Sequence, residues 1–151
     1  MHLAELNIGK FKYPTSDSRM AGFMDNLERV NSLAERSEGF VWRLKGDNGN
    51  ATDLRVGDDY AVNMSVWETP AALENYVFKT VHVQFYKRRE DWFNLIEKPH
   101  MVFWWIPEGH QPSLTEAMDR LADYEKNGAT ENAFGWAEVM DAERMRSLRC
   151  A

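Results

Sequence analysis

The stretch YAVNMSVWETP, residues 60–70, decides the fold because it joins a strand with two unlike faces to the start of a helix. Side chains of a strand alternate between the two faces of a sheet. One face is apolar and the other is mixed, with Tyr60, Val62, Met64 and Val66 against Ala61, Asn63, Ser65 and Trp67. Thr69 followed by Pro70 is typical of a helix start, since threonine caps the first turn and proline fits its first position.

A second strand, predicted over residues 3–9, has the same two faces. Its apolar face carries Ala4, Leu6 and Ile8, and its mixed face carries Leu3, Glu5 and Asn7. If the two strands are neighbours, the mixed faces bring together Glu5, Asn7, Asn63, Ser65 and Trp67. Unpaired buried polar groups cost about 1–3 kcal/mol each, so this cluster favours a partly hydrated cavity beneath helices. The alternative is a solvent-exposed mixed face, which would leave Trp67 in water.

The other segments complete the predicted topology. Apolar residues at helical spacing indicate a helix over 20–34 that stops at Gly39, and a strand follows over 40–44. After the strand over 60–67, a helical pattern runs from 70 to about 96 with a break near Lys79-Thr80. Residues 101–106 are apolar on both faces and indicate the most buried strand.

Two β-α-β units in this order predict an α+β fold of the ferredoxin-like, split βαβ type, with an antiparallel sheet and helices on one face. An extra C-terminal helix follows, capped at Ser113 and ending at Gly128, and then a possible edge strand over 134–139. Residues 45–59 are rich in Gly, Asp and Asn and are predicted as a loop. We expect a single domain over 1–140 and a tail over 141–151.

The composition restricts the partners. The net charge of −6 disfavours nucleic-acid binding, which needs a basic face. The single cysteine, Cys150, excludes an internal disulfide and favours a cytoplasmic location. No apolar run is long enough to cross a membrane. The four histidines lack ligand spacing and no HExxH, phosphate loop or nucleophile–base pair is present, so no metal site is predicted.

The stretch VHVQFYKRREDWF, residues 81–93, supplies the remaining candidate residues. His82 lies on a helical stripe with Tyr86 and Arg89, and its ordinary pKa near 6.5 suits proton transfer. A histidine among aromatic residues is more often structural than catalytic. Arg88 and Arg89 could bind a carboxylate, and salt bridges to Glu90 or Asp91 are an equally good interpretation.

Several motifs together resemble a bacterial domain-of-unknown-function family, numbered 3291. They are AELNIG (4–9), MAGF (20–23), RVNSLAE (29–35), GFVWRL (39–44), NMSVWE (63–68), the 76–93 helix and WWIP (104–107) with GH (109–110). The resemblance covers residues 3 to about 138. It implies a place among the dimeric α+β barrels of the antibiotic-biosynthesis-monooxygenase type, and hence a homodimer with its sheets packed face to face. It also implies a pocket between each sheet and its own helices.

Within that superfamily, monooxygenases use an Asn on the first strand, a Trp on the third strand and a His on the second main helix. Asn7, Trp67 and His82 occupy comparable places, so the resemblance implies catalytic roles for them. Glu5, Asn63, Ser65, Tyr86 and Arg89 are the predicted substrate-binding residues.

The first hypothesis is a cofactor-independent monooxygenase of phenolic or enolic substrates, in which a neutral His82 or Glu5 takes a proton. Asn7 and Trp67 would hydrogen-bond the substrate oxygen. The second hypothesis is a protein that binds haem or another small ligand, with His82 as the axial ligand of the haem. The third is a dimeric structural or regulatory module. The expected partners are a second copy of the chain and a small molecule, with no nucleic acid and no membrane.

Overall fold

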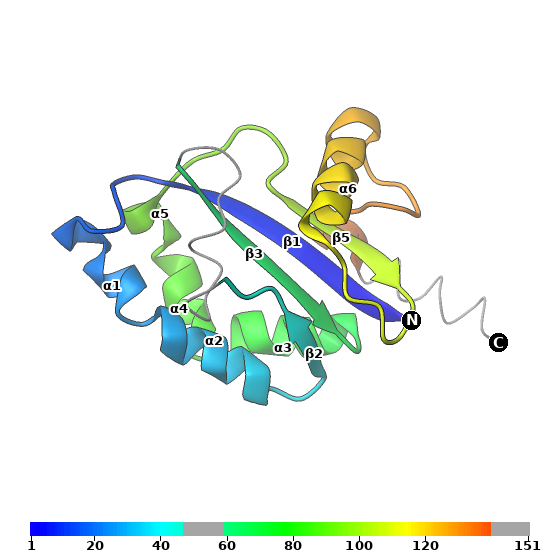
Figure 1. The fold of residues 1–151 in the computed structure, drawn as a ribbon, viewed down its shortest axis with the longest axis horizontal. Coiled ribbons are helices and arrows are strands. Elements are labelled where there is room, and N and C mark those ends of the chain that lie inside the picture. The colour runs from blue at the N-terminus through cyan, green and yellow to red at the C-terminus, as the bar shows by residue number, and fades with distance from the viewer. Residues whose placement is uncertain (47–58, 140–151) are drawn as a thin grey trace.

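A computed structural model describes residues 1–46 and 59–139 of the chain (Figure 1). Its strands are β1 (His2–Phe11), β2 (Phe40–Arg43), β3 (Tyr60–Trp67), β4 (Phe93–Asn94) and β5 (Met101–Ile106). Its helices are η1 (Ser18–Met20), α1 (Ala21–Met24), α2 (Leu27–Arg36), α3 (Pro70–Lys79), α4 (His82–Lys87), α5 (Arg89–Trp92) and α6 (Leu114–Asn127). The predicted bounds of β3 and β5 are confirmed.

The strands form one antiparallel sheet in which β1 is central. The order runs β2-β3-β1, and both β4 and β5 pair with the other edge of β1. This is the strand order of the split βαβ arrangement, so the predicted α+β, ferredoxin-like fold is confirmed. Opposite residues of an antiparallel pair share a face of the sheet. The register places Glu5 opposite Ser65 and Asn7 opposite Asn63, so the two mixed faces do meet.

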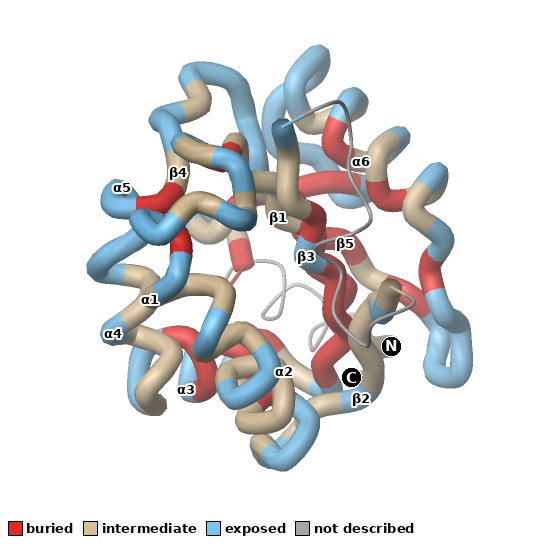
Figure 2. Tube along the Cα trace, turned by 60° about the vertical axis from the view of Figure 1, so that its left-hand side comes forward, coloured by how far each residue is buried: buried red, intermediate tan, exposed pale blue. Residues whose placement is uncertain are grey.

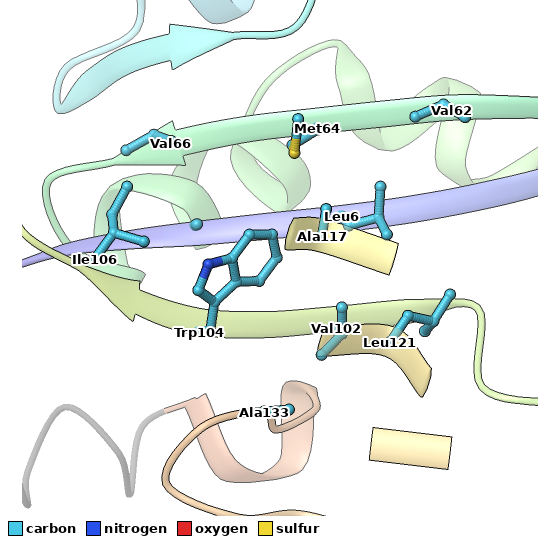
Figure 3. Close-up of a cluster of buried hydrophobic side chains, with 11 residues drawn as sticks. Leu6, Val62, Met64, Val66, Val102, Trp104, Ile106, Ala117, Leu121 and Ala133 are labelled. Carbon is cyan, nitrogen blue, oxygen red and sulfur yellow. The ribbon is translucent and has the colours of Figure 1, made fainter. Parts of the chain in front are cut away.

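Helices α1–α5 lie on one side of the sheet and α6 lies on the other (Figure 2). The helices of the split βαβ unit therefore lie on one face, as predicted, and the extra helix α6, for which no face was predicted, covers the apolar face. Ala117 and Leu121 of α6 pack against Leu6, Val102 and Trp104 of the sheet, as Figure 3 shows. The spacing of these two residues makes one side of α6 apolar, and that side is buried.

The apolar face is buried within the single chain. Leu6, Met64, Val66 and Trp104 are each 0% exposed. Within the described residues, α6 covers this face. The homodimer that the resemblance implies stays a prediction.

The mixed face is covered by α2 and α3. Ala34 of α2 and Leu73 and Val77 of α3 pack with Trp67, which is 0% exposed. The alternative of a solvent-exposed mixed face is therefore wrong around Glu5, Ser65 and Trp67, which are buried, while Asn63 on the same face is exposed. Helix α3 begins as predicted, with the Thr69 hydroxyl accepting from the backbone N–H of Ala72 at 3.1 Å.

The helical pattern over 70–96 breaks at Thr80, as predicted. Thr80 has extended backbone angles (φ −118°, ψ −177°), and its hydroxyl donates to the Tyr76 carbonyl and accepts from the His82 N–H. The helices end at Trp92, earlier than expected, because Phe93 and Asn94 pair with β1. His82, the first residue of α4, is therefore held to the break through its backbone N–H.

The expected edge strand over 134–139 is wrong apart from its first residue. Phe134 forms an isolated bridge with Phe103, and residues 136–139 are helical. Nothing among the described helices has the length and apolar character needed to span a membrane.

Candidate functional site

Glu5 is the centre of a polar cluster between the sheet and the helices. Its side chain belongs to the mixed face of β1 and is 4% exposed. Oε1 accepts hydrogen bonds from the Ser65 hydroxyl at 2.7 Å and from the Asn63 amide at 3.2 Å, and Asn7 also hydrogen-bonds the carboxyl. Four of the predicted residues are thus brought together by the register of β1 and β3.

The Glu5 carboxyl has no cationic partner within ion-pair distance among the described residues. Burial raises the pKa of Glu5 from its ordinary value of 4.5 to about 7, although the hydrogen bonds from Ser65 and Asn7 act in the opposite direction. Near neutral pH the carboxyl can therefore both gain and lose a proton.

Trp67 completes the polar cluster from the third strand. Its indole Nε1–H donates to the Ser65 hydroxyl at 2.9 Å, and that hydroxyl donates in turn to Glu5. Indole has one donor and no acceptor. Trp67 can therefore hydrogen-bond a substrate oxygen, as predicted, only if it releases Ser65.

Aromatic rings form the wall next to this cluster. Tyr76 of α3 stacks on Trp67 with ring centroids 5.2 Å apart. Phe40 of β2 packs edge-to-face against Trp67, with ring centroids 5.4 Å apart. The Tyr76 hydroxyl donates to the Val30 carbonyl at 3.1 Å. Burial first, and the nearby Glu5 carboxylate second, raise the pKa of Tyr76, while Arg43 lowers it. Both charged groups therefore lie close enough to act on Tyr76.

His82 joins this wall through Tyr76. The two rings are 4.8 Å apart, and the Nδ1 atom of His82 lies 3.2 Å from the Val77 carbonyl oxygen. Because a carbonyl can only accept, Nδ1 carries the proton of the neutral ring and Nε2 has the free lone pair. Burial lowers the pKa of His82, against the opposing effect of this hydrogen bond, so the ring is neutral near pH 7.

Tyr86 of α4 and Arg89 of α5 form a separate group. Arg89 is exposed, donates to the Tyr86 carbonyl at 2.8 Å and lies over the Tyr86 ring at 4.4 Å. Among the described residues, no hydrogen bond, ion pair or ring contact joins either side chain to Glu5. Arg88 pairs with Asp91 at 2.9 Å, which matches the salt-bridge interpretation of this basic run.

Sequence reasoning missed Tyr76 and Arg43. Tyr76 could have been found, because it shares the buried side of α3 with Leu73 and Val77. Arg43 could not, because a bulge between Phe40 and Trp42 shifts the alternation of β2. Arg43 therefore lies opposite Ser65 on the mixed face, and it pairs with Glu35 of α2 at 2.8 Å.

Two open hollows lie on the described surface. One is lined by Glu116, Asp119, Arg120, Asp123 and Asn132, away from this cluster. The other follows β2 and includes Phe40 and Arg43, which border the cluster, but its lining contains none of Glu5, Asn7, Asn63, Ser65 and Trp67. A pocket between the mixed face and the helices therefore stays a prediction. Within residues 1–46 and 59–139, the structure contains no group of three or more His, Cys, Asp or Glu side chains placed to hold a metal ion.

Comparisons with known proteins agree with the fold. The model of a family described as "Domain of unknown function (DUF3291)" matches residues 2–150. This span is longer than residues 3–138, over which the sequence motifs resemble the family. No curated protein matches the chain. A protein of unknown function from Nitrosomonas europaea, NE2512, has a TM-score of 0.50 at 12% identity, and the alignment covers 74% of this chain and 95% of that one.

SnoaB, a cofactor-independent oxygenase from Streptomyces nogalater, has a TM-score of 0.48 at 15% identity, with 71% of this chain and 94% of that chain covered. A second crystal structure of SnoaB, of a variant, gives a TM-score of 0.47 at 14% identity, with 74% and 98% covered.

Proposed function

The chain belongs to the DUF3291 family, and from this premise we propose that it is a cofactor-independent monooxygenase of a small phenolic or enolic substrate. The family description gives no activity, so the proposal depends on the site. The substrate would lie between the mixed face of the sheet and helices α3 and α4.

One observation carries the proposal: Glu5 is a buried carboxyl without a cationic partner among the described residues. Burying an unpaired charge is unfavourable, and buried carboxyls in structural roles are normally paired with a cation. Unpaired titratable groups with perturbed pKa values are concentrated at functional sites. Because aromatic rings lie on one side of Glu5 and amide groups on the other, a planar ligand with an ionisable hydroxyl fits the chemistry.

The site residues would contribute in three ways. A base removes a proton from the substrate and leaves an electron-rich anion, which can transfer electrons to dioxygen. In such a reaction the substrate gains one oxygen atom and loses two hydrogens, and the second oxygen atom leaves as water. The amides of Asn7 and Asn63 can donate to the anionic oxygen, and the stacked rings of Trp67 and Tyr76 form the aromatic wall of the site.

The proposal is tested by measuring oxygen uptake with a panel of phenols and hydroxyanthrones. Uptake that forms a quinone product, and that falls at least about tenfold in Glu5→Gln, is the expected result. Glu97→Gln is the matched control, because Glu97 is an exposed glutamate outside the site. If every substrate on the panel gives the same uptake with and without protein, the monooxygenase proposal is wrong.

A haem-binding protein is the second candidate, favoured by the orientation of His82. Metal-binding histidines usually donate their other ring N–H to a carbonyl or carboxylate, as Nδ1 of His82 does to Val77. Titration with hemin gives a Soret band if haem binds in the site. The band should then disappear in His82→Ala, and a band that persists in this variant excludes His82 as the ligand.

The homodimer also remains part of the proposal, on the resemblance to dimeric α+β barrels. Light scattering should then give twice the chain mass of 17.6 kDa. A mass of one chain at micromolar concentration would exclude a stable dimer.

A further inference from the structure

We infer that Glu5, and not His82, accepts the proton of the ligand, and that Ser65 is its positioning residue. This inference rests on the proposed function, because it assigns the base of the same site. It decides between the two bases that the sequence left open, although the sequence-based assignment placed His82 among the catalytic residues and Glu5 among the substrate-binding ones.

The surroundings of Glu5 favour proton uptake. Its hydrogen-bond partners, Ser65, Asn63 and Asn7, are all neutral. The opposite residue on β5, Phe103, is apolar. Among α2, α3, α4 and β2, the titratable or charged groups that are not exposed are Tyr76 of α3, His82 and Tyr86 of α4 and Arg43 of β2, and Arg43 is paired with Glu35. The charged residues of α2 and the remaining charged residues of α3 and α4 are exposed.

The surroundings of His82 oppose proton uptake. Its ring is half-buried against Tyr76, and the only described hydrogen-bond partner of the ring is the Val77 carbonyl. A protonated ring would be a second charge in a partly desolvated place. The Tyr76 ring also lies between His82 and the Trp67–Ser65–Glu5 hydrogen bonds, so His82 has no described hydrogen bond to the polar cluster.

The two candidate bases differ in how many charges the buried site holds after proton transfer. When Glu5 acts, the O–H bond of the ligand breaks, an O–H bond forms on the carboxyl, and the electron pair stays on the ligand oxygen. The buried site holds one negative charge before and after this step. When His82 acts, a neutral ring and a neutral ligand become a cation and an anion beside an ionised Glu5. The second course buries two further charges and is disfavoured.

Ser65 positions the carboxyl because its hydroxyl is held from both sides. It accepts from Trp67 Nε1 at 2.9 Å and donates to Glu5 Oε1 at 2.7 Å. This hydrogen bond stabilises the ionised carboxyl. Removing this hydrogen bond should therefore raise the pKa of Glu5, so the carboxyl becomes a stronger base and stays in place.

The first experiment follows the Glu5 carboxyl in the ligand-free protein by infrared spectroscopy. The band of a neutral carboxylic acid should titrate near pH 7 and be absent in Glu5→Gln. In Ser65→Ala its midpoint should rise by about one pH unit, the size expected for one hydrogen bond. In His82→Gln the midpoint should stay unchanged. A carboxyl that stays in one form from pH 5 to 9 overturns the inference.

The second experiment adds 2-naphthol, which is neutral in water at pH 8 and whose ionised form absorbs at longer wavelength. Binding at pH 8 should produce bound phenolate together with the neutral-carboxyl band of Glu5. Both signals should be lost in Glu5→Gln and kept in His82→Gln. Loss in His82→Gln alone overturns the inference while the proposed pocket stands. Absence of binding in equilibrium dialysis counts against the proposed function, and the ligand-free titration still decides whether Glu5 can take a proton at neutral pH.

Discussion

Replacing Glu5 with glutamine should stabilise the protein at pH 8 and leave its stability unchanged at pH 4. Glutamine has the same shape and keeps an oxygen that can accept from Ser65 and Asn63, but it carries no charge. The unfolded chain has an ordinary glutamate, so folding at pH 8 transfers an ionised carboxyl into a buried site. This transfer is unfavourable in the wild type and absent in the variant.

The magnitude follows from the change in pKa between the unfolded and folded states. A rise from 4.5 to about 7 corresponds to about 3 kcal/mol, at about 1.4 kcal/mol per pKa unit. The folded state binds more protons than the unfolded state between these two values, so wild-type stability falls as pH rises through this window. Above pH 7 the loss is complete, and below pH 4.5 it vanishes. Since Glu5 is 4% exposed, solvent screening reduces the figure little.

The assay is urea unfolding followed by tryptophan fluorescence at pH 4, 6 and 8. The free energy of unfolding of Glu5→Gln should exceed that of the wild type by about 2–3 kcal/mol at pH 8, and the two should converge at pH 4. Glu97→Gln should follow the wild type at every pH, because Glu97 is exposed. A wild-type stability that rises from pH 5 to pH 8 relative to the variant would refute the reasoning.

The remaining predictions concern stability and use the same urea assay. Gly39→Ala should lose about 2 kcal/mol or more, because φ is +78° and a Cβ would lie 2.5 Å from the Ala72 Cβ. Gly109→Ala, where φ is +83° but no atom lies within 4 Å, should lose only about 1 kcal/mol, and equal losses would exclude the contact with Ala72. Leu121→Ala should cost about 2–4 kcal/mol by leaving a cavity under α6, and a cost below about 1 kcal/mol would contradict this packing. Partial burial opposes ionisation of Glu116, but hydrogen bonds from His110 and Trp104 hold its pKa below 4.5. Glu116→Gln should therefore lower the free energy of unfolding by at most about 1 kcal/mol at pH 7. This difference should shrink as the pH falls below 4.5. A constant difference from pH 3 to 7 would argue against this ionisation effect.

Alternation in two strands was enough to predict much of the candidate site. Glu5 and Ser65 each lie between apolar neighbours in sequence, and a strand turns such residues to one face. The ferredoxin-like order then made β1 and β3 neighbours, so their contact followed. The sequence did not distinguish a base from a substrate ligand, because the pKa of Glu5 depends on burial and on the absence of a nearby cation. Both arise from packing of α2 and α3 against the sheet.

Helix α6 shows a second limit of prediction from the sequence. Its cap at Ser113 and its end at Gly128 are local signals, and both were read correctly. Its position on the apolar face was not predicted, because an amphipathic helix can bury its apolar side against any apolar surface. The choice between α6 and a second chain depends on the path of residues 107–113, which no periodicity describes.

The sequence by itself determined the strands, the helix caps and the two faces of the sheet, because alternation and capping depend on neighbouring residues. The tertiary structure alone decided three features of the site: the bulge that places Arg43 opposite Ser65, the stacking of Tyr76 between Trp67 and His82, and the use of the Trp67 N–H by Ser65. Each joins residues on different strands or helices, or depends on a local change of register. Their distances are set by packing of the whole domain, which no local pattern encodes.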